Sequence, residues 1–69
     1  MTAETTLEQA TRHVRDAKRT IARQRALIAK QKEEGYDTET ADSLLIQFEL
    51  ALAIFEDDLL AIQKTIKQN

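Results

Sequence analysis

The sequence predicts an all-α protein: an antiparallel two-helix coiled-coil hairpin that dimerises into a four-helix bundle. The chain has 69 residues with no Pro and a single Gly, Gly35, near its middle. That composition is typical of two long helices joined by one turn. Apolar residues recur with heptad spacing on both sides of the glycine, and the charges beside the two repeats are opposite in sign. The two halves are therefore expected to pack against each other.

The first helix is expected over about residues 5–34. Thr5 and Glu8 have the spacing of a capping box, in which each side chain satisfies a backbone donor of the other residue. Gly35 can adopt the left-handed conformation that ends a helix, and Tyr36 is expected to supply the apolar contact of that cap.

The second helix is expected over about residues 38–67, with Asp37 as its N-cap. Only residues 35–37 remain for the turn, and so short a connection makes the helices antiparallel neighbours. Residues 1–69 are thus interpreted as one helical-hairpin domain.

Each half of the chain supplies two core positions of its heptad repeat. In the first half these positions hold Leu7, Val14, Ile21 and Ile28, with Ala10, Ala17, Gln24 and Gln31. In the second half they hold Leu45, Leu52, Leu59 and Ile66, with Ala41, Phe48, Phe55 and Ile62. Small residues opposite large ones let the backbones approach closely. A buried amide costs stability unless it is hydrogen-bonded, so Gln24 and Gln31 are interpreted as residues that select register or partner, or that lie at partly hydrated ends of the seam.

A charge ladder is predicted along one side of the hairpin. Its rungs are Lys32 with Asp42, Arg25 with Glu49, Lys18 with Glu56 and Thr11 with Gln63. Exposed ion pairs contribute only about 0.2–1 kcal/mol each. We therefore expect the ladder to set the register and orientation of the helices, while buried apolar area supplies the energy.

The other side, which we call the open flank, is largely uncharged. Its residues are Thr6, His13, Thr20, Leu27, Leu44, Ala51, Asp58 and Thr65. The second helix also carries apolar residues beyond its core positions, and a helix that is apolar nearly all round is a buried helix. One partner helix cannot cover it, which predicts a homodimer with the second helices at its centre. The predicted interface residues are Leu27, Leu44, Ala51, Ile54 and Ala61.

Composition narrows the function classes. The chain has no Cys and one His, so disulfides, thiolate metal sites and multi-histidine centres within one chain are excluded. The net charge is −2, with eight Lys or Arg and five Asp or Glu in residues 1–34 and two and seven in residues 35–69. Neither a signal peptide nor a membrane span is expected, which predicts a cytoplasmic protein.

No catalytic, cofactor-binding or metal-binding residue is predicted. His13 and Asp58 have the chemistry of an acid–base pair, but no nucleophile is placed beside them, and the favoured interpretation is a structural pair or simple solvent exposure. Glu56, Asp57 and Asp58 are adjacent carboxylates that point about 100° apart on a helix, so they do not converge on one ion.

The outer face of the first helix carries a basic stripe that suggests an alternative function. The stripe consists of Arg12, Arg15, Arg19, Arg23 and Lys30. Such a face can bind phosphates or an acidic partner. The acidic overall charge and the absence of interleaved aromatic residues favour a solvated face over a nucleic-acid site.

Several segments resemble one family. They are His13-Val14-Arg15-Asp16-Ala17, Ile21-Ala22-Arg23-Gln24, Leu27-Ile28-Ala29, Gly35-Tyr36-Asp37-Thr38, Leu44-Leu45 and Phe48-Glu49. Their order resembles that of short uncharacterised two-helix proteins of alphaproteobacteria such as rhizobia. In that family a Gly-His-Asp-Thr turn often joins two amphipathic helices, and Tyr36 here replaces the usual His. The resemblance covers roughly residues 13–60 and implies a stand-alone helical hairpin without an established activity.

The function expected from these observations is a non-enzymatic structural or protein-interaction module that self-associates through its second helix. Binding of nucleic acid or another polyanion through the basic stripe is the alternative. An enzyme or metal protein built at a dimer seam around His13 and the carboxylates of Glu56, Asp57 and Asp58 ranks third.

Overall fold

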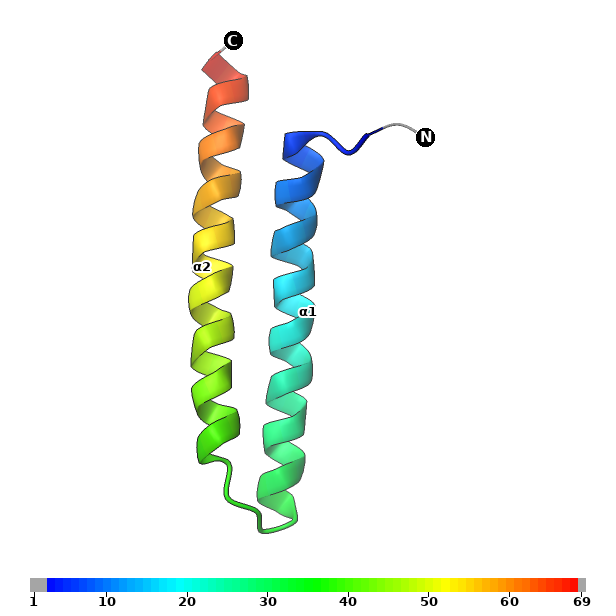
Figure 1. The fold of residues 1–69 in the computed structure, drawn as a ribbon, viewed down its shortest axis with the longest axis vertical. Helices are drawn as coiled ribbons and strands as arrows, with labels where there is room; N and C mark the ends of the chain where they lie inside the picture. The colour runs from blue at the N-terminus through cyan, green and yellow to red at the C-terminus, as the bar shows by residue number, and fades with distance from the viewer. Residues whose placement is uncertain (1–2, 69) are drawn as a thin grey trace.

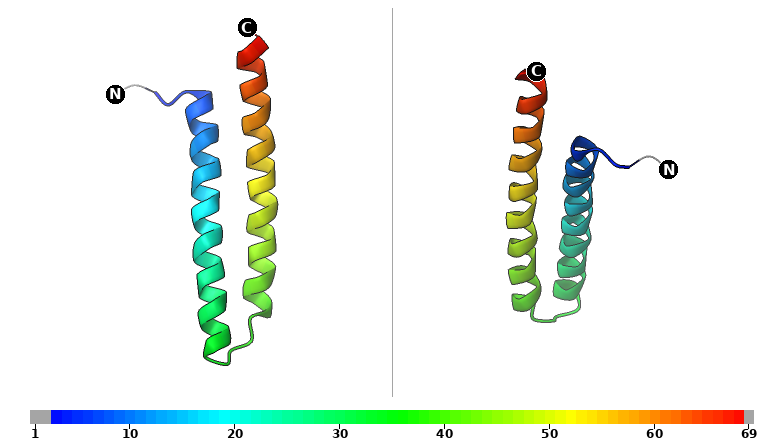
Figure 2. Two further views of the ribbon diagram at one scale, coloured as in Figure 1. Left: turned by 180° about the vertical axis from the view of Figure 1, so that it is seen from behind. Right: turned by 45° about the horizontal axis from the view of Figure 1, so that its top comes forward.

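The protein is a hairpin of two antiparallel helices. The computed structural model describes residues 3–68, with side chains described for residues 3–67. Helix α1 spans Thr6–Glu33 and helix α2 spans Glu39–Gln68. They lie side by side along their length (Figures 1 and 2), and all regular structure within residues 3–68 is helical. The predicted all-α hairpin is confirmed, while the four-helix bundle stays a prediction.

The start of α1 is fixed by the predicted capping box. The backbone N–H of Glu8 donates to Thr5 Oγ1 at 3.1 Å, and the backbone N–H of Thr5 donates to Glu8 Oε1 at 3.4 Å. Each side chain thereby satisfies a backbone donor that the first turn of a helix leaves free.

The end of α1 is a Schellman motif around Gly35, which has a φ of 83°. The N–H of Tyr36 donates to the carbonyl of Gln31 at 2.9 Å, and that of Gly35 donates to the carbonyl of Lys32 at 3.1 Å. These are the two bonds that define the motif, and glycine adopts the positive φ without the steric cost of a Cβ. The Tyr36 side chain is 64% exposed, so the predicted apolar contact of this cap buries little surface.

The start of α2 differs from the prediction by one residue. The helix begins at Glu39, so Thr38 rather than Asp37 immediately precedes it. Asp37 still accepts a hydrogen bond from the Glu39 N–H, at 3.0 Å from its Oδ1. Thr38 is buried; its carbonyl accepts the Asp42 N–H at 2.7 Å, and its hydroxyl donates to Asp42 Oδ2 at 3.1 Å. Thr38 can hold this position because its side chain is both small and hydrogen-bonded.

The core is one seam between the helices. Its buried side chains all come from α1, namely Ala10, Val14, Ile21, Gln24 and Ile28. The seam residues of α2, such as Phe48 and Phe55, are only half-buried. Among the side chains that the structure describes, none is completely buried. A single layer of contact therefore leaves α2 incompletely covered.

Candidate interaction surfaces

Three contacts define the register between the helices. The ring centroids of His13 and Phe55 lie 5.1 Å apart, with the rings tilted by 40°. Gln24 Nε2 donates to the carbonyl oxygen of Ala41 at 3.0 Å, and Arg25 contacts Glu49 at 3.7 Å. From His13 to Arg25 the α1 residue lies nearer the turn, and its α2 partner moves from Phe55 to Glu49, also nearer the turn, so the two helices run antiparallel. This is the antiparallel alignment that the charge ladder predicted.

The ladder itself is only partly formed. Arg25 and Glu49 make the predicted ion pair, and both side chains are about half exposed. Within the described residues no ion pair joins Lys18 to Glu56 or Lys32 to Asp42. Asp42 instead accepts the hydroxyl of Thr38. The two ion pairs that are not formed both involve exposed lysines, whose side-chain entropy opposes holding one geometry in water.

The open flank contains two adjoining hollows. The first, which we call the inner hollow, has a volume of about 310 Å³ and is lined by His13, Asp16, Ala17, Thr20, Phe48, Ala51 and Phe55. The second, the end hollow, has a volume of about 180 Å³ and is lined by Thr6, Gln9, Ala10, His13, Phe55, Asp58 and Ile62. His13 and Phe55 line both, so the hollows form one groove between the helices. The groove exists because small residues of the flank, such as Ala51 and Thr20, leave the sides of the phenylalanine rings uncovered.

His13 and Asp58 both line the end hollow but are not bonded to each other within the described residues. The imidazole packs against the ring of Phe55 instead. In residues 3–68, no group of three His, Asp or Glu side chains is arranged to hold a metal ion. Asp58 is exposed, and so are Glu56 and Asp57 beside it.

The predicted dimer residues lie on exposed or half-exposed surface. Leu27 and Leu44 are 45% and 40% exposed, and Ile54 is 62% exposed. Ala51 is half-buried in the inner hollow, and Ala61 is exposed. Large apolar side chains also stand on the far side of α2, namely Ile46, Leu50 and Leu60. The hairpin therefore leaves an apolar surface over much of α2.

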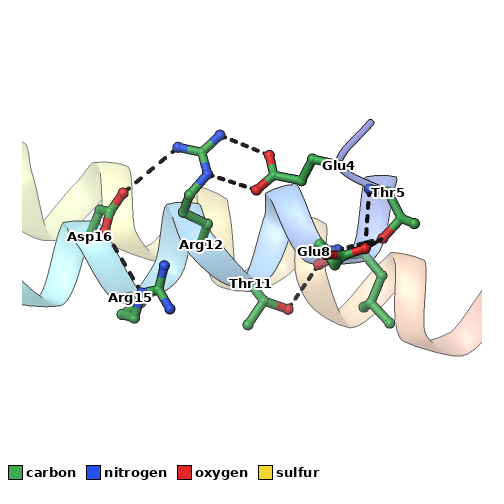
Figure 3. A network of polar contacts seen from close by, with 8 residues as sticks. Glu4, Thr5, Glu8, Thr11, Arg12, Arg15 and Asp16 are labelled. Carbon is green, nitrogen blue, oxygen red and sulfur yellow. Dashed lines mark hydrogen bonds and ion pairs between the residues drawn. The ribbon is translucent and has the colours of Figure 1, made fainter. Parts of the chain in front are cut away.

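The basic stripe of α1 is partly neutralised by carboxylates of the same chain. Arg12 makes two hydrogen bonds to Glu4, of 2.9 and 3.0 Å, and lies 3.8 Å from Asp16. Arg15 lies 3.9 Å from the other oxygen of Asp16, so the carboxylate stands between two guanidinium groups (Figure 3). Hydrogen bonding from Arg12 holds the pKa of the Glu4 carboxyl below its ordinary value of 4.5. The same contact raises the pKa of Arg12.

The rest of the stripe lies further along the same helix. Arg19, Arg23 and Lys30 are exposed. Within the described residues, none of the three makes an ion pair.

Two features were missed at the sequence level. Glu4 lies ahead of the helix, where heptad spacing carries no information, so its bidentate contact with Arg12 was not predicted. Gln31 keeps one buried oxygen, Oε1, without a hydrogen-bond partner among the described residues. Gln24 thus makes a hydrogen bond between the helices, whereas the buried oxygen of Gln31 makes none. The role of the two amides in selecting register or partner stays a prediction.

Within residues 3–68, neither helix has an apolar run long enough to cross a membrane. Comparisons of the chain with protein-family models, curated proteins and solved structures found no match. The resemblance to the two-helix proteins of alphaproteobacteria therefore stays a prediction.

Proposed function

We propose that this protein is a non-enzymatic helical interaction module that self-associates through α2 into a four-helix bundle. The observation that carries the proposal is the incomplete burial of α2. Every buried apolar side chain of the seam belongs to α1, whereas the predicted interface residues Leu44 and Ile54 of α2 are 40% and 62% exposed. Fully burying an exposed side chain of this kind is favourable by roughly 1.5–3 kcal/mol. These side chains are about half exposed, so roughly half of that remains for each as a driving force for association.

The exposed area supports the same conclusion. The hairpin exposes 5640 Å², whereas a compact monomer of its mass, 7.9 kDa, exposes roughly 4400 Å². Two separate hairpins together expose twice 5640 Å² of surface. A compact particle with the mass of two chains exposes roughly 7300 Å². The difference, about 4000 Å², matches the area that obligate homodimer interfaces bury. A dimer as compact as an average protein of its mass would therefore bury the area of an obligate interface.

The proposal includes a cytoplasmic location and no catalytic role. The packing of His13 on Phe55, rather than against Asp58, supports a structural function for the histidine. Binding of a polyanion through the basic stripe is less well supported, because Arg12 and Arg15 already contact Glu4 and Asp16.

Sedimentation equilibrium over the micromolar range tests self-association. We expect the mass of a dimer at high concentration and a shift toward the monomer on dilution. A folded, helical chain that stays monomeric throughout would contradict the proposal. A salt-titrated gel shift with DNA and RNA tests the alternative, since binding through the stripe should weaken steeply as salt rises.

A further inference from the structure

A second stripe of α2 has a pattern that complements itself. It lies beside the seam that faces α1 and consists of Leu44, Gln47, Ala51, Ile54, Asp58, Ala61 and Thr65. These residues are spaced alternately three and four apart, which is the spacing of a coiled-coil seam. The stripe runs along the open flank, where the inner and end hollows lie.

The stripe pairs well with an antiparallel copy of itself. When the two-fold axis passes between Leu52 and Ala53, paired residue numbers sum to 105. Leu44 then faces the partner's Ala61, and Ala51 faces the partner's Ile54. Each large side chain therefore meets a small one, which is the arrangement that lets facing layers interdigitate.

The polar residues of the stripe pair at the same register. Gln47 then faces the partner's Asp58, so an amide donor meets a carboxylate at two symmetric places. Neither side chain has a hydrogen-bond or ion-pair partner within the described residues, so both are available for this contact. A parallel α2 pair would instead place Asp58 beside the partner's Asp58, and like charges there are repulsive.

The shape of the open flank agrees with this register. The partner's Ile54 arrives at the height of Ala51, which lines the inner hollow together with Phe48 and Phe55. The partner's Leu44 arrives at the height of Ala61, beside the end hollow and its lining residue Ile62. Of the two large apolar side chains of the stripe, the more exposed one, Ile54, thus meets the larger hollow.

The charge distribution on α2 is compatible with a second copy binding along the stripe. The acidic residues Asp42, Glu49 and Glu56 lie on the ladder side, as the contact of Glu49 with Arg25 shows. Asp58 is then the one charged residue of the stripe. Two acidic helices can therefore meet along it without a row of facing carboxylates.

We propose that two hairpins associate through antiparallel α2 helices, with Leu44 on the partner's Ala61, Ile54 on the partner's Ala51, and Gln47 bonded to the partner's Asp58. This inference rests on the proposed self-association and adds its face, direction and register. In the resulting bundle the turns around Gly35 point to opposite ends.

Spin-label distances test the direction. The chain has no Cys, so single cysteines at Ser43, Asp57 and Lys64, on the side of α2 away from α1, can be labelled individually. The register predicts axial separations between the two labels of about 28, 14 and 35 Å, respectively, from a rise of 1.5 Å per residue.

Three results are distinguishable in this experiment. A distance between labels that is shorter at position 57 than at positions 43 and 64 supports the proposal. Nearly constant distances along α2 overturn it, because they indicate copies whose turns lie at the same end, while self-association itself stands. A lack of any interchain distance, together with a monomer in sedimentation, contradicts the proposed function as well.

Charge variants at Gln47 test the register independently. Gln47→Lys gains an ion pair with the partner's Asp58 at two places and should lower the Kd of the dimer roughly two- to tenfold, whereas Gln47→Glu should raise it by a similar factor. The double variant Gln47→Glu with Asp58→Lys should return the Kd close to that of the parent chain.

The matched controls are Gln63→Lys and Gln63→Glu. Gln63 is exposed on the ladder side of the same helix, so these variants make the same change in net charge away from the stripe. We expect them to change the Kd by less than about twofold, as surface charges without a close partner usually do. Equal effects at positions 47 and 63, or a double variant without rescue, would overturn the proposed register.

Discussion

Gln24 donates its side-chain amide to the main-chain carbonyl of Ala41 across the helix pair, at 3.0 Å. Gln24 is buried, and it is the only buried polar side chain of α1 within the described residues. The bond ties the last third of α1 to the first turn of α2. A slip of either helix by one turn would leave the amide without this acceptor, so the contact favours the observed register.

We expect Gln24→Ala to lower the free energy of unfolding by about 1–3 kcal/mol, because it removes both the hydrogen bond and buried volume. Gln24→Met keeps most of the volume and should cost about 1 kcal/mol. Urea denaturation followed by circular dichroism measures both, at one chain concentration because association shifts apparent stability. The control is the exposed Gln63→Ala, and a Gln24→Ala effect no larger than the control's would contradict the role assigned to the bond.

Gly35→Ala should destabilise the hairpin by about 1 kcal/mol through the backbone alone. The φ of Gly35 is 83°, and a Cβ at this position would have no atom within 4 Å, so no steric clash adds to the cost. Gly35→Asn should reduce the stability of the fold by less than Gly35→Ala does, because asparagine tolerates the left-handed region better than alanine. Thermal unfolding ranks the three chains, and an alanine variant as stable as the parent would be inconsistent with this cap.

Thr5→Ala should cost about 0.5–2 kcal/mol, since it removes the hydroxyl that accepts the Glu8 N–H. Thr11→Ala is the matched control, because the Thr11 hydroxyl merely donates to the carbonyl of Leu7 within the helix. We expect the control to lie within about 0.5 kcal/mol of the parent. Similar losses in both variants, measured by urea denaturation, would argue against a specific capping effect.

The Glu4 carboxyl should titrate below its ordinary pKa of 4.5 because Arg12 hydrogen-bonds to the charged form. A lowered pKa in the folded state means that the contact stabilises the fold above the unfolded-state value and that this contribution is lost as the pH falls through the folded-state value. The carboxyl carbon shift of Glu4, followed by NMR from neutral to acidic pH, gives the midpoint. Arg12→Gln should raise the midpoint again. An unchanged midpoint would show that the hydrogen bond from Arg12 is not what lowers the pKa of Glu4.

The sequence predicted those parts of the fold that depend on local chemistry. The capping box of Thr5 and Glu8 and the left-handed Gly35 were both predictable, because each depends on residues only a few positions apart. Heptad spacing also predicted the antiparallel alignment, since the ion pair of Arg25 with Glu49 follows from it. It did not predict that Gln24 would reach Ala41.

The sequence did not predict which of several neighbouring groups an individual side chain contacts. His13 packs on Phe55 rather than pairing with Asp58, because the flat imidazole can cover an aromatic ring while the exposed carboxylate stays in water. Asp42 accepts a hydrogen bond from the hydroxyl of Thr38 rather than pairing with the ammonium group of Lys32. Thr38 lies close by, because its carbonyl already accepts the backbone N–H of Asp42. Such choices depend on differences of a few tenths of a kcal/mol that heptad spacing does not encode.

The hairpin geometry also determines how the molecule should respond to mechanical load. Helix α1 begins and α2 ends at the same end of the hairpin (Figure 1), so a force applied to those two points loads the seam one layer at a time. Unzipping of this kind proceeds at low force and travels toward the glycine turn. A pull between the glycine turn and the start of α1 would instead load α1 along its own axis, against its helical hydrogen bonds, rather than open the seam.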